Sequence, residues 1–157
     1  MIIISHRGNL EGPQSCIENH PESIASALSL GFDVEIDLWM TEEMHLYLGH
    51  DHHEYRIDLA WLEKRKRSLW VHCKDLASLE YFATSLSGYN FFFHQKDDYT
   101  LTSKGFVWVY PGKSPPKNSV VVLPEIETDW LHRLPITRNI YGVCTDFPTA
   151  LKQSQIS

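Results

Sequence analysis

Residues 2–38 decide the fold of this chain, and they read IIISHRGNLEGPQSCIENHPESIASALSLGFDVEIDL. The apolar runs at residues 2–5 and 34–38 have the composition of buried β-strands. Between them, residues 19–30 carry apolar side chains at helical spacing, with Pro21 near the first turn and Gly31 as a C-terminal stop. Strand, helix and strand in this order predict a parallel βαβ unit.

Further short apolar runs with β-rich composition continue this pattern along the chain. They lie at residues 46–48, 69–73, 91–93, 106–110, 120–123 and 141–144. Several runs are continuously apolar, which is typical of strands buried on both faces of a parallel sheet. A second helix is predicted from about residue 76 to residue 86, ahead of Gly88.

Eight candidate strands of this kind predict an α/β fold of the (β/α)8 TIM type. Such a barrel typically needs about 250 residues, and this chain has 157. The connections at 49–59, 99–106 and 111–119 are too short or too rich in proline for full helices. We therefore expect residues 1–157 to form one compact barrel domain with several connecting helices shortened or missing. A doubly wound open sheet is the alternative.

Composition excludes several classes of protein. The net charge of -6 argues against a general nucleic-acid binder, and the one basic run, residues 63–67, is interpreted as a solvated helix face or turn. No stretch approaches the roughly 18 apolar residues of a membrane span, and the N-terminus lacks the features of a signal peptide. The three widely spaced cysteines predict neither a disulfide framework nor a cysteine zinc site. We expect a cytoplasmic protein with reduced thiols.

Polar residues stand at or just beyond the ends of the apolar runs. In either architecture, ligands bind at the carboxyl ends of parallel strands, so these side chains should converge on one mouth. The residues concerned are His6, Arg7, Glu35, Asp37, His50, His72, Lys74 and His94.

The second strand carries two acidic residues, Glu35 and Asp37, that point to the same side because residues two apart in a strand share a face. Val34, Ile36 and Leu38 then pack outward against helices. Two inward carboxylates repel each other unless a cation or a proton compensates. A hard divalent ion such as Mg²⁺ or Ca²⁺ suits them.

Several of these motifs occur in a recognisable order. They are His6-Arg7-Gly8, Glu18-Asn19, Ser23, Ala27, Gly31, Glu35-x-Asp37, His50-Asp51 and the closing YGVCTDFP at 141–148. In this order they resemble the glycerophosphodiester phosphodiesterase family, within the wider phospholipase C-like phosphodiesterase barrels. The detailed resemblance covers about the first third of the chain and its C-terminal end, whereas the middle is only weakly similar.

The resemblance implies metal-assisted cleavage of a phosphodiester. It assigns His6 and His50 as the pair of general acid and base, and Arg7 and Lys74 as contacts of the phosphate. Two histidines that titrate near neutrality suit this reaction independently of the family. The polar loop that begins at His94 either contacts the alcohol group of the substrate or is a solvated loop.

The resemblance also implies that Glu35 and Asp37 hold the metal together with a glutamate on the fourth strand, two residues before the lysine. Here His72 stands in place of that glutamate. Carboxylates favour Mg²⁺ or Ca²⁺, whereas a histidine ligand also admits Mn²⁺ or Zn²⁺. Three interpretations stay open: Glu125 supplies the missing carboxylate, His72 itself is a ligand, or a charged His72 binds phosphate.

The function expected from the sequence is cleavage of a small, soluble phosphodiester, without nucleic acid or membrane as a partner. Two alternatives remain. A catalytically degenerate barrel would bind a phosphorylated metabolite or a partner protein without turnover, as the His72 substitution indicates. A phosphodiester lyase would keep the acid and base residues and release a cyclic phosphate.

Overall fold

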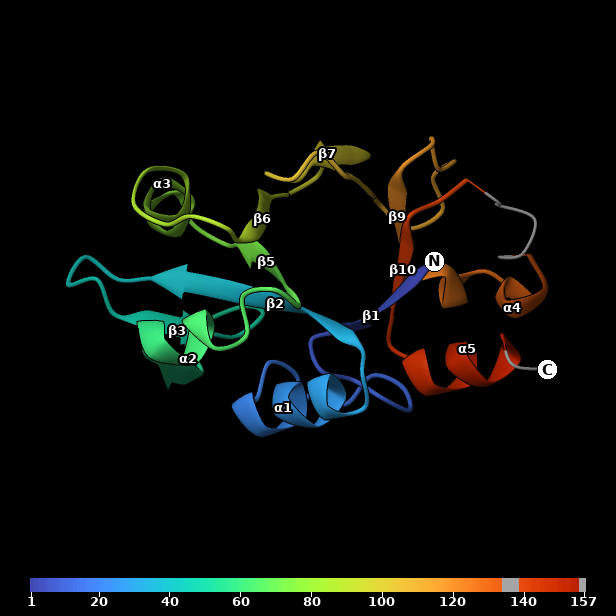
Figure 1. The fold of residues 1–157 in the computed structure, drawn as a ribbon, viewed down its shortest axis with the longest axis horizontal. Helices are drawn as coiled ribbons and strands as arrows, with labels where there is room; N and C mark the ends of the chain where they lie inside the picture. The colour runs from blue at the N-terminus through green and yellow to red at the C-terminus, as the bar shows by residue number, and fades with distance from the viewer. Residues whose placement is uncertain (134–138, 156–157) are drawn as a thin grey trace.

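The computed structural model describes residues 1–133 and 139–155, and its main feature is a ten-stranded mixed sheet that curls around a central interior (Figure 1). The strands are β1 (Ile2–His6), β2 (Asp33–Met40), β3 (Leu46–Leu48), β4 (Tyr55–Ile57), β5 (Leu69–Cys73), β6 (Asn90–Phe93), β7 (Tyr99–Leu101), β8 (Val107–Val109), β9 (Ser119–Val122) and β10 (Gly142–Thr145). The helices are α1 (Pro21–Ser29), α2 (Leu59–Glu63), α3 (Leu76–Thr84), α4 (Trp130–Arg133) and α5 (Pro148–Ser154), with a 3-10 turn η1 (Pro124–Ile126).

The central strands are parallel, in the order β6-β5-β2-β1-β10-β9-β8. Three short strands run antiparallel to their neighbours: β3 pairs with β2, β4 with β3, and β7 with β8. Figure 1 shows α1, α3 and α5 on the outside of the curl. The interior is therefore lined by strands, and the carboxyl ends of the parallel strands open on one side.

The expectation of a (β/α)8 TIM-type barrel is wrong. Helices α1 and α3 do connect β1 to β2 and β5 to β6, but the connection between β8 and β9 at 110–118 contains no helix. Antiparallel β3, β4 and β7 occupy connections where an alternating barrel would place helices. Between β8 and β9 the physical reason is length, because a parallel crossover with its helix needs a dozen or more residues and residues 110–118 are fewer. The doubly wound alternative is not observed either, since α1, α3 and α5 cover only the outer face (Figure 1).

Local sequence explains the two longest helices, which were both predicted. In α1, the His20 side chain accepts a hydrogen bond from the Glu22 amide at the N-terminus, Pro21 stands in the first turn, and Gly31 follows with a left-handed φ of 84°. In α3, the Asp75 side chain caps the N-terminus by accepting from the Ser78 amide at 2.7 Å. Both helices thus begin and end within a few residues of the predicted positions.

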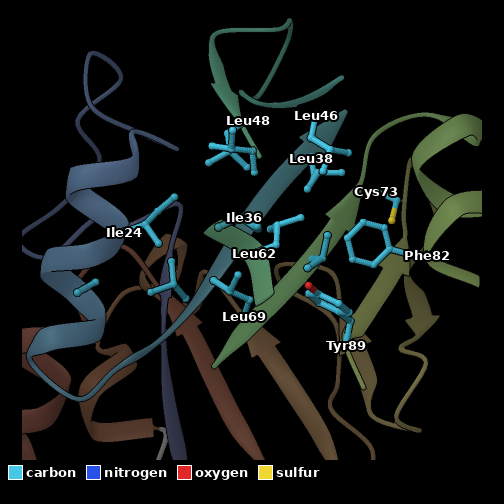
Figure 2. Packing of buried hydrophobic residues seen from close by; sticks show 14 residues of the cluster. Ile24, Ile36, Leu38, Leu46, Leu48, Leu62, Leu69, Cys73, Phe82 and Tyr89 are labelled. Carbon is cyan, nitrogen blue, oxygen red and sulfur yellow. The ribbon is translucent and has the colours of Figure 1, made fainter. Parts of the chain in front are cut away.

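The larger hydrophobic core lies between the outer face of the sheet and the helices (Figure 2). Val34, Ile36 and Leu38 of β2 are fully buried there, which confirms the predicted alternation along this strand. Leu62 of α2 and Phe82 of α3 close the same cluster. Each such side chain contributes about 1.5 to 3 kcal/mol by leaving water, so this layer fixes β2 and β5 rigidly.

A second apolar cluster fills the inside of the curl. Its members come from alternate positions of six parallel strands and are Ile4, Trp70, Phe92, Trp108, Val120, Val122 and Cys144. Because side chains alternate with a period of two, the next inward positions lie two residues further along each strand. On β1, β5, β6 and β10 these positions are polar. They include His6, His72, His94 and Asp146. The apolar cluster is therefore the floor of a polar site. Within the described residues, no helix is both long and apolar enough to cross a membrane.

Candidate metal centre and histidine pair

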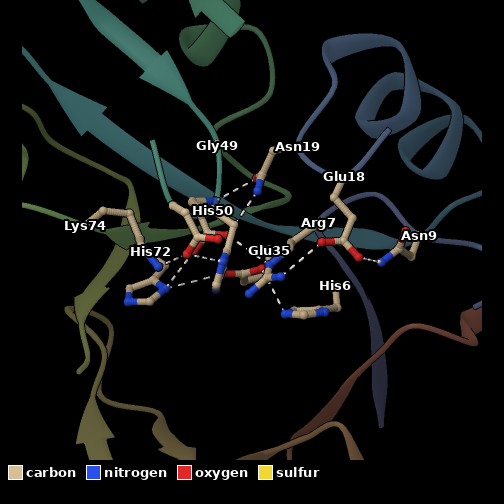
Figure 3. A network of polar contacts seen from close by, with 12 residues as sticks. His6, Arg7, Asn9, Glu18, Asn19, Glu35, Gly49, His50, His72 and Lys74 are labelled. Carbon is tan, nitrogen blue, oxygen red and sulfur yellow. Dashed lines mark hydrogen bonds and ion pairs between the residues drawn. The ribbon is translucent and has the colours of Figure 1, made fainter. Parts of the chain in front are cut away.

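A cavity of about 840 Å³ opens above the apolar floor at the carboxyl ends of the parallel strands. Its lining includes most of the residues that the sequence singles out, namely His6, Arg7, Glu35, His50, His72, Lys74 and His94. Asp37 lies directly beneath them with no exposed surface. The predicted convergence on one mouth is therefore observed, and Figure 3 shows all of these side chains together except His94 and Asp37, which it does not label.

Glu35, Asp37 and His72 form a compact group of potential metal ligands. One ligand atom from each lies within 4.8 Å of the others. His72 Nδ1 is 3.0 Å from Asp37 Oδ1 and 3.8 Å from Glu35 Oε1. Glu35 Oε2 is buried and accepts no hydrogen bond from the described residues. Buried carboxylate oxygens without a donor are costly, and two carboxylates with one imidazole suit a divalent ion.

The orientation of His72 supports this interpretation. Its Nε2 lies 2.9 Å from the backbone carbonyl of His94, and because a carbonyl only accepts, Nε2 carries the hydrogen. When His72 is neutral, Nδ1 therefore presents its lone pair toward Glu35 and Asp37. The ring stacks on Phe92 at 5.1 Å between centroids, which fixes its plane. Metal-bound histidines usually donate their other ring N–H in this way.

Asp37 is also surrounded by protein cations and an amide. Arg7 Nε lies 2.9 Å from Oδ2, and Lys74 Nζ lies 3.2 Å from Oδ1. Asn19 makes two hydrogen bonds with Asp37. Its Nδ2 donates to Asp37 Oδ2 at 3.0 Å, and its Oδ1 accepts from the Asp37 amide at 2.9 Å. These contacts hold the carboxylate in one orientation.

The two carboxyl groups differ in their electrostatics. Burial raises the pKa of Asp37, but contact with His72 and the charges of Arg7 and Lys74 outweigh it and hold that pKa well below its ordinary value. Burial, and next the charge of Asp37, raise the pKa of Glu35. Asp37 is therefore the more acidic of the two carboxyl groups.

His6 is paired with an acid from the far end of the chain. Its Nδ1 lies 2.7 Å from Asp146 Oδ1, so Nδ1 carries a hydrogen, and its Nε2 lies 4.0 Å from Glu35 Oε2. Burial lowers the pKa of His6, but the hydrogen bond with Asp146 and the charge of Glu35 raise it overall. Burial raises the pKa of Asp146, and the hydrogen bond with His6 lowers it overall. The pair leaves Nε2 as the reactive nitrogen.

A chain of hydrogen bonds and ion pairs joins this pair to the Glu35–Asp37–His72 group. Figure 3 shows its part from Asn9 through Glu18 to Arg7. Asn9 Nδ2 contacts both Asp146 Oδ1 at 2.8 Å and Glu18 Oε1 at 3.1 Å, and Glu18 Oε2 accepts from Arg7 at 3.0 Å. Sequence reasoning missed Asn9 and the role of Asp146. The alternation that predicted Glu35 would have found Asp146, because it stands two residues after the inward-facing Cys144.

His50 lies at the rim, two residues after β3. Its Nδ1 is 2.8 Å from Asp51 Oδ1, and its side chain is 41% exposed, so it can exchange protons with solvent. Burial and the charge of Arg7 lower its pKa. The preceding Gly49 is anchored because its carbonyl accepts from Trp39 Nε1 at 2.6 Å.

Two predicted site residues, His94 and Glu125, make hydrogen bonds outside the Glu35–Asp37–His72 group. His94 Nε2 contacts the Asp97 carbonyl, and the His94 ring stacks on Tyr110, which places His94 on the wall of the cavity. Glu125 Oε1 accepts from the Asp146 amide at 2.7 Å. Among the described residues, the group that could hold a metal ion contains His72 and not Glu125.

Comparison with protein-family models, with curated proteins and with solved structures finds no match. The function is therefore argued from the arrangement of the site.

Proposed function

We propose that this protein cleaves small phosphodiesters with the help of a divalent metal ion. The observation that carries the proposal is the buried Glu35–Asp37–His72 group, in which Glu35 Oε2 lacks a hydrogen-bond donor, next to a histidine oriented by Asp146. Metal ligands, a proton donor and two cations at one mouth are the parts that phosphoryl transfer needs. Apart from His72, which stands in place of a glutamate of that family, these residues belong to the motifs that resemble glycerophosphodiester phosphodiesterases.

Glu35, Asp37 and His72 would hold the ion, with Mg²⁺ and Ca²⁺ favoured by the carboxylates, and Mn²⁺ and Zn²⁺ also admitted by the imidazole. When bound, the ion supplies positive charge that stabilises the phosphorane-like transition state. Arg7 and Lys74 now contact Asp37, and both line the cavity. Their charges are therefore close enough to contact a bound phosphate as well.

His6 and His50 divide the proton transfers. His6 is the general acid in this proposal, because Asp146 stabilises its charged form and leaves the Nε2 proton for the leaving oxygen. His50 is the general base that takes the proton from the attacking hydroxyl. The new bond joins that oxygen to phosphorus while the bond from phosphorus to the leaving alcohol breaks. A water gives hydrolysis, whereas a neighbouring substrate hydroxyl gives a cyclic phosphate.

One observation favours a second candidate, a module that binds a phosphorylated metabolite without turnover. Asp37 already has protein cations on both oxygens, since Arg7 and Lys74 lie within 3.2 Å. The negative charge of Asp37 is thus already compensated by protein cations. Arg7 and Lys74 can then turn toward a bound anion without any metal.

The test is an assay of glycerophosphodiesters and bis-(p-nitrophenyl) phosphate with Mg²⁺, Ca²⁺, Mn²⁺ or Zn²⁺, followed by ³¹P NMR of the products. Metal-dependent cleavage that is lost in His6→Ala supports the proposal. The matched control is His52→Ala, because His52 is 74% exposed and does not line the cavity. A cyclic phosphate that accumulates identifies a lyase. Phosphate binding without cleavage under any ion supports the binding module.

A further inference from the structure

The cavity has two unlike walls. On one side, β1, β2 and β5 present the charged groups of the metal centre. The other side is formed by β8, β9, η1 and the residues next to them. Its lining is mostly apolar and consists of Trp108, Tyr110, Pro111, Val122, Leu123 and Ile126. The proposed chemistry uses only the charged wall, so the apolar wall needs a separate explanation.

The apolar wall is presented to the cavity by a defined backbone. Leu123 has a left-handed φ of 46°, and its amide donates to the Cys144 carbonyl at 2.8 Å. This turn starts η1, and the Ile126 amide donates back to the Leu123 carbonyl at 3.2 Å. A non-glycine residue in this region costs about 1 kcal/mol or more. Other contacts therefore hold the chain in the turn that brings Ile126 to the mouth.

Two side chains of this wall are accessible, whereas Trp108 and Val122 are buried. Ile126 is 67% exposed and Tyr110 is 47% exposed. Tyr110 is held in place because its ring stacks on His94 at 5.6 Å between centroids, and its amide donates to the Asp98 carbonyl at 3.0 Å. Ordered apolar surface that continues directly from a polar reaction site is typical of ligand pockets.

The charges around the wall restrict what can occupy it. Arg7, Lys74 and Lys96 line the same cavity, and Glu35 is the only acidic residue in its described lining. A cationic alcohol group would therefore meet repulsion and no carboxylate outside the metal centre. A polyol would lose hydrogen bonds to water against apolar side chains.

We infer that the preferred substrates are phosphodiesters in which one ester group is uncharged and apolar, and that this group packs on Tyr110 and Ile126. The inference rests on the proposed function, because the phosphate must sit at the metal centre. It narrows the substrate class from glycerophosphodiesters in general to those with an apolar alcohol.

The test compares the benzyl and methyl diesters of glycerol 3-phosphate, which share the reacting phosphate and leave as alcohols of similar acidity. The expected kcat/KM is about tenfold higher for the benzyl diester. Ile126→Ser and Tyr110→Ala each remove most of this preference, because they lower kcat/KM for the benzyl diester more than for the methyl diester. The matched control is Leu76→Ser, because Leu76 is 74% exposed on α3, outside the cavity.

Calorimetric binding of both diesters to the protein in EDTA separates this inference from the proposed function. Tighter binding of the benzyl diester that is lost in Ile126→Ser supports the apolar subsite even if no ion produces turnover. Equal kcat/KM and equal binding for the two diesters overturn the inference, while metal-dependent cleavage of both would leave the proposed function standing.

Discussion

His6 and Asp146 are 140 positions apart in the sequence, and their side chains meet at 2.7 Å. The contact exists because β1 and β10 are parallel neighbours, with Ser5 opposite Thr145. The carboxyl ends of the two strands therefore meet at the cavity. This pairing orients the imidazole so that Nε2 is its free nitrogen.

Replacing this acid should change the titration of the histidine. In Asp146→Asn, loss of the carboxylate removes a contribution that raises the His6 pKa, so the pKa of His6 should fall while burial continues to lower it. The measurement is an NMR titration of the imidazole protons in EDTA, with His52→Ala used to assign an exposed histidine. An unchanged His6 titration would show that Asp146 does not control its protonation.

The same variant predicts a pH-dependent loss of stability. Because the pKa of His6 is raised, its protonation stabilises the fold fully below pH 6.5, the ordinary pKa. This stabilisation is lost as the pH rises through the raised pKa. Because the pKa of Asp146 is lowered, its ionisation stabilises the fold fully above pH 3.8, the ordinary pKa. This stabilisation is lost as the pH falls through the lowered pKa. Asp146→Asn should therefore lower the free energy of unfolding by about 1 to 3 kcal/mol at about pH 5 and by less at about pH 8.5. Urea unfolding at both pH values measures the difference.

Asn19 should control metal affinity although it is not among the proposed ligands. It is fully buried and contacts Asp37 through two hydrogen bonds. Asn19→Ala leaves the carboxylate without this orientation, and the expected loss of Mn²⁺ affinity is about 10- to 100-fold. Isothermal titration with Mn²⁺ measures it. A folded Asn19→Ala protein with unchanged affinity would contradict this role.

Gly49 should be required for the position of His50. A Cβ atom at Gly49, where φ is 148°, would lie 2.1 Å from the His52 carbonyl oxygen, so the loop must shift. Gly49→Ala should lower both stability and turnover. Gly31→Ala is the matched control, because Gly31 also has positive φ but its Cβ meets nothing within 4 Å. That variant should cost only about 1 kcal/mol and keep full turnover. Urea unfolding and the phosphodiester assay compare the two, and equal effects would contradict the prediction.

The cysteines should differ sharply in reactivity. Burial raises the pKa of Cys73 to about 12 and raises that of Cys144 strongly, whereas Cys16 is exposed. A thiol reagent should therefore modify Cys16 rapidly in the native protein and all three thiols only after unfolding. Rapid modification of two thiols in the native state would show that the sheet opens more readily than its packing indicates.

The sequence predicted the local structure better than the architecture. The alternation of Val34, Glu35, Ile36 and Asp37 correctly gave the buried and inward faces of β2, because a period of two follows from strand geometry alone. The antiparallel direction of β3 and the absence of a helix between β8 and β9 depend on the path of the short connections that precede β3 and β9. Apolar runs do not reveal strand direction, and the resulting barrel prediction failed.

The candidate site was predicted in a similar way. Residues at strand ends, such as His6 and His72, could be identified because parallel strands bring their carboxyl ends together. Asn9 lies in a loop without periodicity, and its bridge from Asp146 to Glu18 depends on the path of that loop. Glu125 followed a strand as expected, but the left-handed turn at Leu123 directs the chain so that Glu125 contacts Asp146.

The most direct test of the metal centre is isothermal titration of EDTA-treated protein with Mn²⁺, repeated for Glu35→Gln and for the exposed control Glu42→Gln. The structure predicts one site per chain, an affinity at least about tenfold weaker in Glu35→Gln, and no change in Glu42→Gln. Activation of cleavage should follow the same concentration dependence. No binding of Mn²⁺, or binding that Glu35→Gln leaves unchanged, would contradict the proposal that Glu35, Asp37 and His72 hold a catalytic ion.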